Sequence, residues 1–485
     1  MAHNALPRPS SLPGIEDLRR GYTPSTHEAR QSIEERSKQL RLEQERIDAE
    51  LDRHIAEMQR LSLRRRDVVR ELDLNHALLA PVHRLFPELL SEVFIHAVQD
   101  PFNVQKTDFA VRVLCGVCTT WRAAARATPL LWTFIDLSYI TSLEDPLLRL
   151  QLQLSGQLPL TVTAKVQDQA MQLLLVAFFD GMSDEDASRV VEITVEDDGV
   201  VLSQLRSRHL ATLRVADVNI WDTCTQGELG FLTSAPTLHK LTIGVQYECE
   251  DDDAALAFPV PVIPDLPCLT HLILAIENEF PVSAFLPAIS QLAPVLRVLK
   301  MSSFEVSAWE ETKPTVTCEM HVLHSLELQH YTHRFLTFIT APALHAVTLI
   351  GDDAQLGKED PTESLLDLLT RSRPPLRSFA LHDPMQGSAS ALSGCIDLME
   401  GLQRLNIEDN ERGVTSSPRL AAVLQRLVCD ENTPPMLPEL RSLSVQCRGD
   451  KSPCVHSDVA APLSQVRLSR KDPRVCAGRA VAALE

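Results

Sequence analysis

This 485-residue sequence is poor in aromatic residues, glycine and basic charge, and each shortage narrows what the chain can be. Phe, Trp and Tyr make up only 5% of it and there are 17 glycines, so leucine and valine must supply most of the core packing. The 46 Lys and Arg residues are outnumbered by 65 Asp and Glu residues, which gives a formal net charge of −19. Because phosphate binding needs a basic face, this balance argues against nucleic acid as a partner.

Long apolar runs are missing as well. No run reaches the roughly 18 residues that a membrane-spanning helix needs. The longest candidate, from Met171 to Phe179, is interrupted by Gln172 and is followed by Asp180. We therefore expect no membrane partner, and the first residues also lack the pattern of a secretory signal. The 11 cysteines are odd in number and have no disulfide-like spacing, which favours reduced thiols in the cytoplasm, the nucleus or both.

The motifs of several enzyme classes are absent. There is no glycine-rich phosphate loop, no zinc-protease helix signature and no Gly-x-Ser-x-Gly turn. Cys115 and Cys118 form a Cys-x-x-Cys pair, but no second pair follows, and we expect both on one apolar helix face as core residues. The histidines between 321 and 333 surround a predicted strand, whose alternation would scatter them. We expect no enzymatic activity, no metal and no cofactor.

The N-terminal part of the chain divides into two segments. Residues 1–28 are rich in Pro, Ser and small polar residues and are predicted to be disordered. Residues 29–76 contain no Gly or Pro, and their charged helix formers predict a coiled-coil-like helix. Two interpretations stay open, namely a homodimer through residues 30–75 or a helix that packs on its own chain. The heptad positions are Ile33, Ser37, Leu40, Gln44, Ile47, Leu51, His54, Met58, Leu61, Arg65, Val68 and Leu72.

The most informative segment lies between residues 85 and 132. It reads LFPELLSEVFIHAV, breaks at a polar turn, and resumes as VRVLCGVCTTWRAAARATPLLW, with apolar residues at helical spacing in both parts. Pro87 stands where a helix tolerates proline, at its first position, and Glu88 lies in the first turn. A bundle of about 45 residues is too small to bury so much apolar surface. The remainder indicates a face that binds a partner.

This segment resembles the F-box, the module that docks a protein onto the Skp adaptor of cullin-based ubiquitin ligases. The resemblance rests on Leu-x-Pro-Glu-Leu-Leu, Val-Cys-x-x-Trp-Arg and the closing Thr-Pro-Leu-Leu-Trp, and it is closest to the type common in mushroom-forming fungi. The family usually has Leu-Pro where this chain has Leu85-Phe86. The resemblance implies an F-box over residues 77–137 with a Skp-type adaptor and a cullin ligase as partners.

The same resemblance implies which side chains build the F-box and its adaptor face. Within this set we expect Leu89, Val93, Val117 and Trp121 in the core. The whole set is Leu85, Pro87, Leu89, Leu90, Val93, Phe94, Leu114, Val117, Trp121 and Arg122. Adaptor contacts are expected from Pro87, Leu90 and Phe94.

A repeated unit occupies the rest of the chain. It has an apolar residue, a second one three positions later and a third two positions after that. The last two share one face of a strand, and a single unit cannot bury its apolar face, so neighbours must stack into a parallel sheet. The pattern resembles a leucine-rich repeat, and Thr242, Ile273, Lys300 and Glu327 would line its concave surface. The units begin at Val190, Leu210, Leu238, Leu269, Leu296, Leu323, Leu344, Leu376, Leu402 and Leu440.

The predicted fold class is α/β. A long N-terminal helix and a three-helix F-box precede an irregular leucine-rich-repeat solenoid over 138–447, and a flexible tail over 448–485 follows. The acidic runs 248–253 and 351–360 are expected to be solvated loops. The hypothesis that follows is an F-box substrate receptor that links an unknown protein target to the ligase. The alternative is a repeat scaffold, independent of any ligase, that self-associates through its N-terminal helix.

Overall fold

The protein is mixed α/β, with a long N-terminal helix and a large parallel sheet, and contacts group its residues into two compact units, Met1–Leu90 and Ser91–Glu485. Most of the N-terminal segment 1–28 and of the two acidic runs lies outside the described residues. The computed structural model describes residues 16, 19–21, 23–98, 107–140, 142–166, 168–197, 210–221, 228–246, 262–276, 282–303, 317–351, 360–382, 389–409, 418–430, 432, 434–447 and 457–484.

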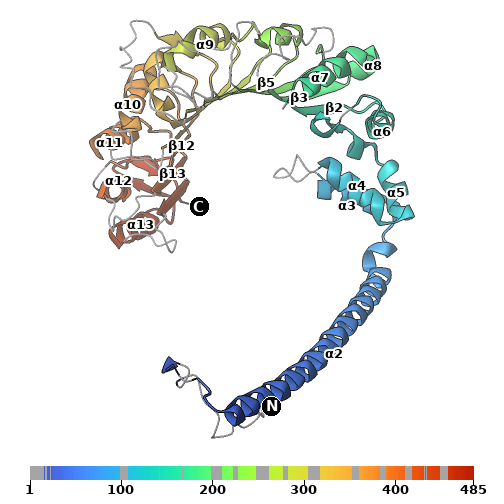
Figure 1. The fold of residues 1–485 in the computed structure, drawn as a ribbon. Coiled ribbons are helices and arrows are strands. Elements are labelled where there is room, and N and C mark those ends of the chain that lie inside the picture. Colours follow the sequence, from blue (N-terminus) through green and yellow to red (C-terminus); the bar gives the residue numbers. More distant parts are fainter. Residues whose placement is uncertain are drawn as a thin grey trace. The chain divides into compact units, whose positions relative to one another are not determined.

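The first unit is dominated by one helix, α2, which spans His27–Leu79 (53 residues; Figure 1). The side chain of Thr26 caps its start by accepting from the backbone N–H of Ala29 at 3.3 Å. It continues past the predicted range 29–76 because no Gly or Pro interrupts the chain before Pro81, which opens the 3-10 turn η1 (Pro81–Arg84). None of its residues is buried. A helix was predicted here, and its pairing remains a prediction.

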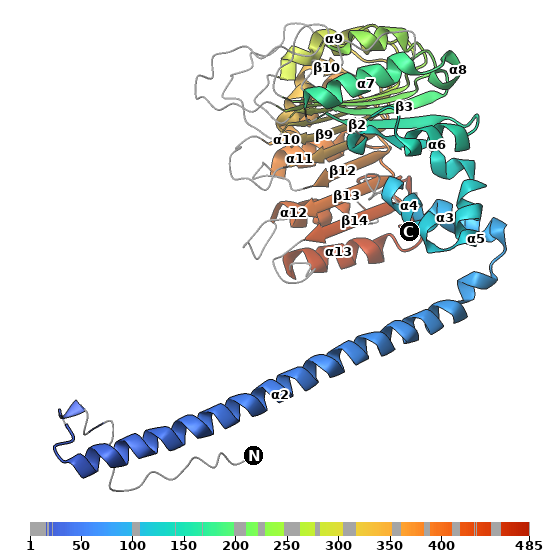
Figure 2. The ribbon, with the colours of Figure 1, turned by 45° about the vertical axis from the view of Figure 1, so that its right-hand side comes forward.

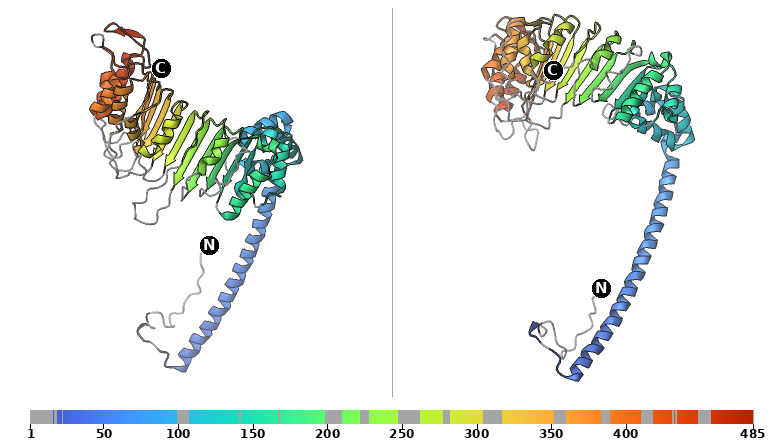
Figure 3. Two further views of the ribbon diagram at one scale, coloured as in Figure 1. Left: turned by 90° about the horizontal axis from the view of Figure 1, so that it is seen from above. Right: turned by 45° about the horizontal axis from the view of Figure 1, so that its top comes forward.

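The second unit is built on one sheet in which each strand is parallel to its neighbours and follows them in sequence order. Figures 1 and 3 show the strands side by side in a single layer. Two short pairs, β8 (Cys318–Glu319) with β10 (Ile339–Thr340) and β15 with β16, lie outside it. The sheet comprises β1 (Phe134–Asp136), β2 (Leu160–Lys165), β3 (Val190–Asp197), β4 (Val215–Trp221), β5 (Lys240–Gln246), β6 (His271–Ile276), β7 (Val298–Ser303), β9 (Ser325–His330), β11 (Ala346–Ile350), β12 (Ser378–His382), β13 (Arg404–Asp409) and β14 (Ser442–Cys447).

The register of the sheet follows the repeated apolar unit. Leu272 pairs with Leu241 on one side and Leu299 on the other, and this row continues through the sheet as a buried layer. All predicted units except the second coincide with the register. There the strand positions are Ala216 and Val218, so the unit begins at Leu213. The error arose because Leu210 is also buried, in the preceding turn, where its carbonyl accepts from the N–H of Leu213 at 3.1 Å.

One boundary of the sheet also differs from the sequence prediction. Strand β1 pairs with β2, so Phe134–Asp136 belongs to the sheet and not to the module predicted over 77–137.

On the face opposite the helices, Thr242, Ile273, Lys300 and Glu327 are consecutive register partners. This is the row that the sequence analysis placed on the concave surface.

Helices and 3-10 turns cover one face of the sheet (Figures 1 and 2). The apolar residues of 282–292 and 363–369 have helical spacing, and they lie on η8 (Val282–Phe285) with α9 (Leu286–Leu292) and on α10 (Pro361–Ser372). Each element buries apolar side chains on the strand layer, for example Leu232, Ile289 and Leu365. The connecting elements are α6 (Pro146–Leu154), α7 (Gln169–Gly181), α8 (Asp184–Ala187), η7 (Glu228–Ser234), η8 (Val282–Phe285), α9 (Leu286–Leu292), η9 (Tyr331–Phe338), α10 (Pro361–Ser372), α11 (Ala389–Asp397), α12 (Pro418–Leu427) and α13 (Ser457–Ser469). A short 3-10 turn, η4 (Leu137–Tyr139), follows β1.

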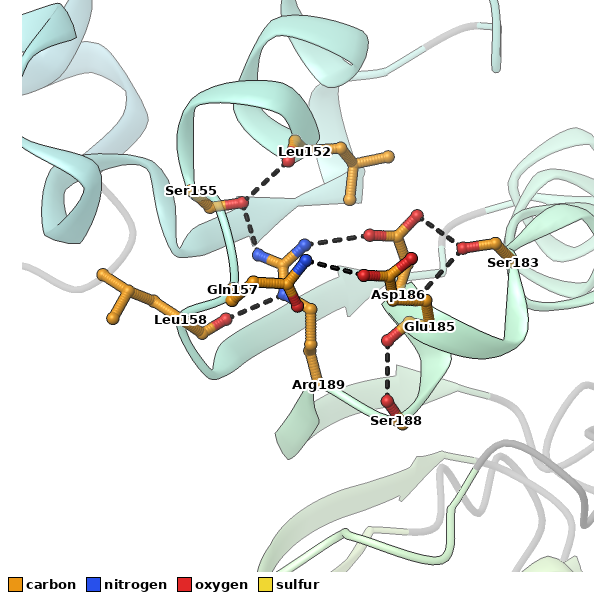
Figure 4. A network of polar contacts seen from close by, with 9 residues as sticks. All are labelled: Leu152, Ser155, Gln157, Leu158, Ser183, Glu185, Asp186, Ser188 and Arg189. Carbon is orange, nitrogen blue, oxygen red and sulfur yellow. Dashed lines mark hydrogen bonds and ion pairs between the residues drawn. The ribbon is translucent and has the colours of Figure 1, made fainter.

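A buried arginine joins the elements at the start of the sheet (Figure 4). Arg189 donates to the Ser155 hydroxyl at 2.6 Å, to the Leu158 carbonyl at 3.0 Å and to Asp186 at 2.9 Å. Ser183 in turn accepts from the Asp186 N–H and caps α8. These bonds link the end of α6 to α8, which satisfies a cation that would be costly to bury unpaired. We assign this network a structural role.

The C-terminal segment is folded, so the prediction of a flexible tail over 448–485 is wrong for residues 457–484. Helix α13 packs on α12, and strands β15 (Arg474–Cys476) and β16 (Arg479–Val481) form an antiparallel pair. Arg470 is fully buried and donates to the carbonyls of Leu427 at 3.1 Å, Leu437 at 2.8 Å and Met436. Burial lowers the pKa of this guanidinium. The hydropathy pattern did not predict that this segment is folded, because a charged side chain, that of Arg470, anchors it.

Candidate functional site

The candidate site begins with helix α3 (Pro87–Val98), which has Pro87 as its first residue, as predicted. Leu90 and Phe94 lie one turn apart on it and are 2% and 0% exposed. Leu89 and Val93 lie one turn apart on another face and are 51% and 46% exposed. The helix therefore buries the pair that we expected to contact the adaptor and exposes the pair that we expected in the core.

Two further helices, α4 (Thr107–Val117) and α5 (Thr119–Arg126), follow α3. Cys118 directly follows the first and caps the second, because its Sγ accepts from the Trp121 N–H at 3.4 Å. Cys115 and Cys118 thus belong to different elements and not to one helix face, as the sequence analysis assumed. The Arg122 Nε donates to the Cys115 carbonyl at 2.9 Å and so ties the start of α5 to the last turn of α4.

An aromatic pair forms the centre of this helical group. The rings of Phe94 and Trp121 have centroids 4.9 Å apart and are tilted by 54°. Trp121, for which a core role was expected, is half-buried, and its Nε1 has no hydrogen-bond partner among the described residues. An indole N–H that is buried without a partner gives up the hydration it has in water. The ring packing, and not this N–H, therefore stabilises the group.

The segment that closes the helical group contains two structural residues, Thr128 and Trp132, that were not among the predicted site residues. The Thr128 hydroxyl lies 2.7 Å from that of Ser91 and donates to the Ala124 carbonyl at 2.8 Å. Trp132 ends the 3-10 turn η3 (Pro129–Trp132), is buried, and donates from Nε1 to the Ala125 carbonyl at 2.8 Å. The motif Thr-Pro-Leu-Leu-Trp was the available signal, since a buried tryptophan needs an acceptor for its N–H.

Large apolar side chains remain exposed around this core. In the second unit Val93, Val113, Val117 and Leu130 are between 44% and 50% exposed. Val113 and Val117 lie one turn apart on α4, so they share one face. Val117 was expected in the core, and this expectation is wrong, whereas Leu114 is half-buried.

In the first unit, Phe86 and Leu89 are exposed as well, at 72% and 51%, whereas Leu85 is half-buried. Apolar residues scattered singly on a surface need no explanation. A gathering of exposed apolar residues is more typical of an interaction surface than of a freely solvated one.

A shallow pocket of about 140 Å³ lies beside the same helices. Ligand pockets usually measure about 300–1,000 Å³, so this one is too small for a substrate of ordinary size. Burial raises the pKa of the Cys115 thiol at its wall, against the opposing charges of Arg126 and Arg122. A thiol of raised pKa is a poor nucleophile at neutral pH. The lining residues are Val111, Arg112, Cys115, Arg122, Arg126, Trp132, Leu147 and Leu150.

The histidines between 321 and 333 are engaged separately. The Nε2 of His321 lies 3.0 Å from a carboxylate oxygen of Glu319, and the Nδ1 of His324 donates to the Val322 carbonyl at 2.5 Å. His333 is buried with Nδ1 3.4 Å from the Ser364 hydroxyl. Across the described ranges, no group of three or more His, Cys, Asp or Glu side chains could hold a metal ion.

Two further observations complete the description. None of the helices in the described part of the chain combines the length and apolar character needed to cross a bilayer. Comparison with protein-family models and with curated proteins finds no match to this chain. The site must therefore be interpreted from its own geometry.

Proposed function

We propose that the chain is an F-box-type substrate receptor, whose helical group α3 to α5 docks onto a Skp-type adaptor of a cullin ubiquitin ligase. The observation that carries this proposal is the exposure of Val93, Val113, Val117 and Leu130 around a core whose aromatic pair is already packed. The core does not need these side chains, and covering them with a partner removes apolar surface from water. We choose a Skp-type adaptor as the partner because residues 85–132 resemble the F-box.

The parallel sheet supports the second half of the proposal, a leucine-rich-repeat-like array that holds a protein target. Its apolar units stack in sequence order, and one face carries the helices while the other does not. The C-terminal segment with Arg470 would serve as the end cap that such arrays need. Catalysis would come from the ligase, and the receptor would contribute proximity by raising the concentration of target near a charged conjugating enzyme.

The docking half is tested by co-purification of the full chain with a Skp-type adaptor. Substituting Val113→Glu together with Val117→Glu puts charge on the exposed face of α4 without lowering its helix propensity. We expect adaptor binding to weaken by at least about tenfold, because charged groups would be desolvated at the centre of the interface.

The matched control places the same charge on exposed apolar residues elsewhere in the second unit, as Leu173→Glu with Leu398→Glu. It should bind the adaptor like the wild type. Leu90→Asp with Phe94→Asp is not a docking variant, because both side chains are buried and their substitution would unfold the helical group. Equal binding by the α4 variant and the wild type would contradict the assigned surface.

A second candidate function, a self-associating repeat scaffold independent of any ligase, is favoured by α2. This helix has no buried residue, yet it carries exposed apolar side chains at heptad positions, including Leu40, Ile47, Leu51, Met58 and Leu61. A coiled coil would cover them. The two functions are compatible, since a receptor can also dimerise, and adaptor capture distinguishes a receptor from a scaffold alone.

A further inference from the structure

One edge of the sheet is basic in a protein whose net charge is −19. The residues that lead into successive strands, or open them, are repeatedly arginine, lysine or histidine from β4 to β14. We name this set the basic edge. It consists of Arg214, His239, Lys240, His271, Arg297, His324, His345, Arg377, Arg404 and Arg441, and all of them except His345 are exposed.

The members of the basic edge lie on neighbouring strand starts, where backbone hydrogen bonds hold most of them side by side; Thr270 and Gln403 occupy two positions of the row. The N–H of His324 donates to the Arg297 carbonyl at 2.8 Å, that of His345 to His324 at 2.9 Å, and that of Arg377 to His345 at 2.8 Å. The rings of His324 and His345 stack with centroids 5.2 Å apart and planes within 8°. Adjacent strands lie about 4.8 Å apart, so the column presents a cationic or ionisable group at almost every strand.

The arginines of the basic edge form no close ion pair with a described carboxylate, and Lys240 interacts with Asp217 only beyond ion-pair distance. No carboxylate of the described residues lies within 4.0 Å of any of these arginines or of Lys240. The lysines elsewhere on the sheet behave differently, since Lys165 pairs with Glu196 at 2.7 Å and Lys300 with Glu327 at 2.6 Å. A row of arginines without close ion pairs among the described residues is a surface suited to an anionic partner.

The histidines show that the column is crowded with positive charge. The pKa of His271 is lowered, chiefly by burial and further by Lys240, Arg297 and His239. In His239 and His324 the Nδ1 donates to a backbone carbonyl, of Thr237 and Val322. A carbonyl only accepts, so Nδ1 carries the proton and Nε2 is the ring nitrogen left for another partner.

We propose that the basic edge binds an extended acidic segment of a protein partner. In an extended chain, side chains on one face repeat every second residue, about 6.6 Å apart, which lets successive carboxylates meet cations on neighbouring strands. Arginine suits this role because its guanidinium binds a carboxylate in a bidentate manner. The inference rests on the proposed function for the role of that segment, which would be the recognised part of the target.

Nucleic acid fits the basic edge less well. Single-stranded binders stack bases on aromatic side chains, and no Phe, Tyr or Trp occurs among the residues of the basic edge. The acidic remainder of the chain would also repel the dense charge of a phosphate backbone more than the sparser charge of a peptide.

The proposal is tested with the full-length protein and a fluorescent 20-residue peptide of alternating Glu and Ser, measured by anisotropy at about 0.15 M salt. We expect saturable binding that weakens at higher salt. The variant Arg297→Glu with Arg377→Glu should bind at least about tenfold more weakly. The control variant Arg149→Glu with Lys471→Glu makes the same charge change at exposed residues that are not members of the basic edge, and it should bind normally.

Three results would overturn the proposal. They are no binding of the peptide by the wild type, equal loss in the control variant, or stronger binding of a 20-nucleotide oligothymidylate than of the peptide. Thermal unfolding verifies that the variants are folded. Adaptor capture by the Arg297→Glu, Arg377→Glu variant separates the two proposals, since it should be normal even where peptide binding is lost.

Discussion

Two individual side chains affect the stability of this protein in ways that can be tested, and the first is Trp121. Its ring packs on Phe94, but its Nε1 has no partner among the described residues. Trp121→Phe keeps an aromatic ring and removes an unpaired donor, so we expect a change in unfolding free energy below about 1.5 kcal/mol. Trp121→Ala leaves a cavity and should cost roughly 2–3 kcal/mol, somewhat less than for a fully buried tryptophan. Chemical denaturation measures the unfolding free energy of both variants. If Trp121→Phe lowered it as much as Trp121→Ala does, the indole N–H would matter and the packing explanation would be wrong.

The second residue is Asp217, on the sheet face opposite the helices. Burial raises the pKa of its carboxyl, Glu192 and Glu196 raise it further, and Lys240 opposes them. A raised pKa means that the folded state favours the protonated acid, so its stability contribution is present at low pH and is lost as pH rises. Asp217→Asn, which mimics the protonated form, should therefore raise the melting temperature at pH 7. The gain should vanish near about pH 3.5, below the ordinary aspartate pKa of about 3.9. A variant less stable than the wild type at pH 7 would refute this account.

At the scale of elements, α2 offers the clearest test. If its heptad residues pair two copies, Leu51→Asp with Met58→Asp should convert a dimer into a monomer, because charges would enter the seam. The control, Leu42→Asp with Leu63→Asp, changes exposed leucines outside the heptad positions and should remain dimeric. Light scattering after size exclusion measures the mass of each. A wild-type monomer at tens of micromolar would contradict self-association.

The elements differ in how well the sequence predicts them. The extent of α2 follows from the absence of Gly and Pro, and the register of the sheet follows from apolar alternation, since a slip by one residue would turn each leucine to the wrong face. The sequence could not predict which face of α3 is buried. Leu89 and Val93 form one apolar pair, Leu90 and Phe94 form a second pair beside it, and the two are equally apolar. Which pair is buried depends on the helices that pack against it.

The C-terminal elements were missed for a different reason. Helix α13 contains Pro462 in its interior and buries Val459, Leu463 and Val466. It is anchored further by Arg470, whose guanidinium donates to backbone carbonyls. A hydropathy pattern does not show that a buried cation donates hydrogen bonds to carbonyls. The sequence of the C-terminal segment therefore predicted irregular structure.

At the scale of the whole molecule, charge is divided unevenly. The net charge of −19 predicts a surface that repels anions, yet the basic edge gathers positive charge along the starts of the strands. The net charge does not reveal this division, because it is a sum over all residues. The stacking of the strands brings residues that are distant in sequence, such as Arg297 and Arg377, to one edge. The sheet topology thus turns scattered residues into a surface.

Docking of the helical group α3 to α5 onto a Skp-type adaptor can be measured by calorimetric titration of the purified full-length protein with a purified Skp-type adaptor. We expect a one-to-one complex with a dissociation constant in the micromolar range or tighter, and a negative heat-capacity change from the burial of apolar surface. No heat of binding at tens of micromolar adaptor, over a range of temperatures, would contradict it.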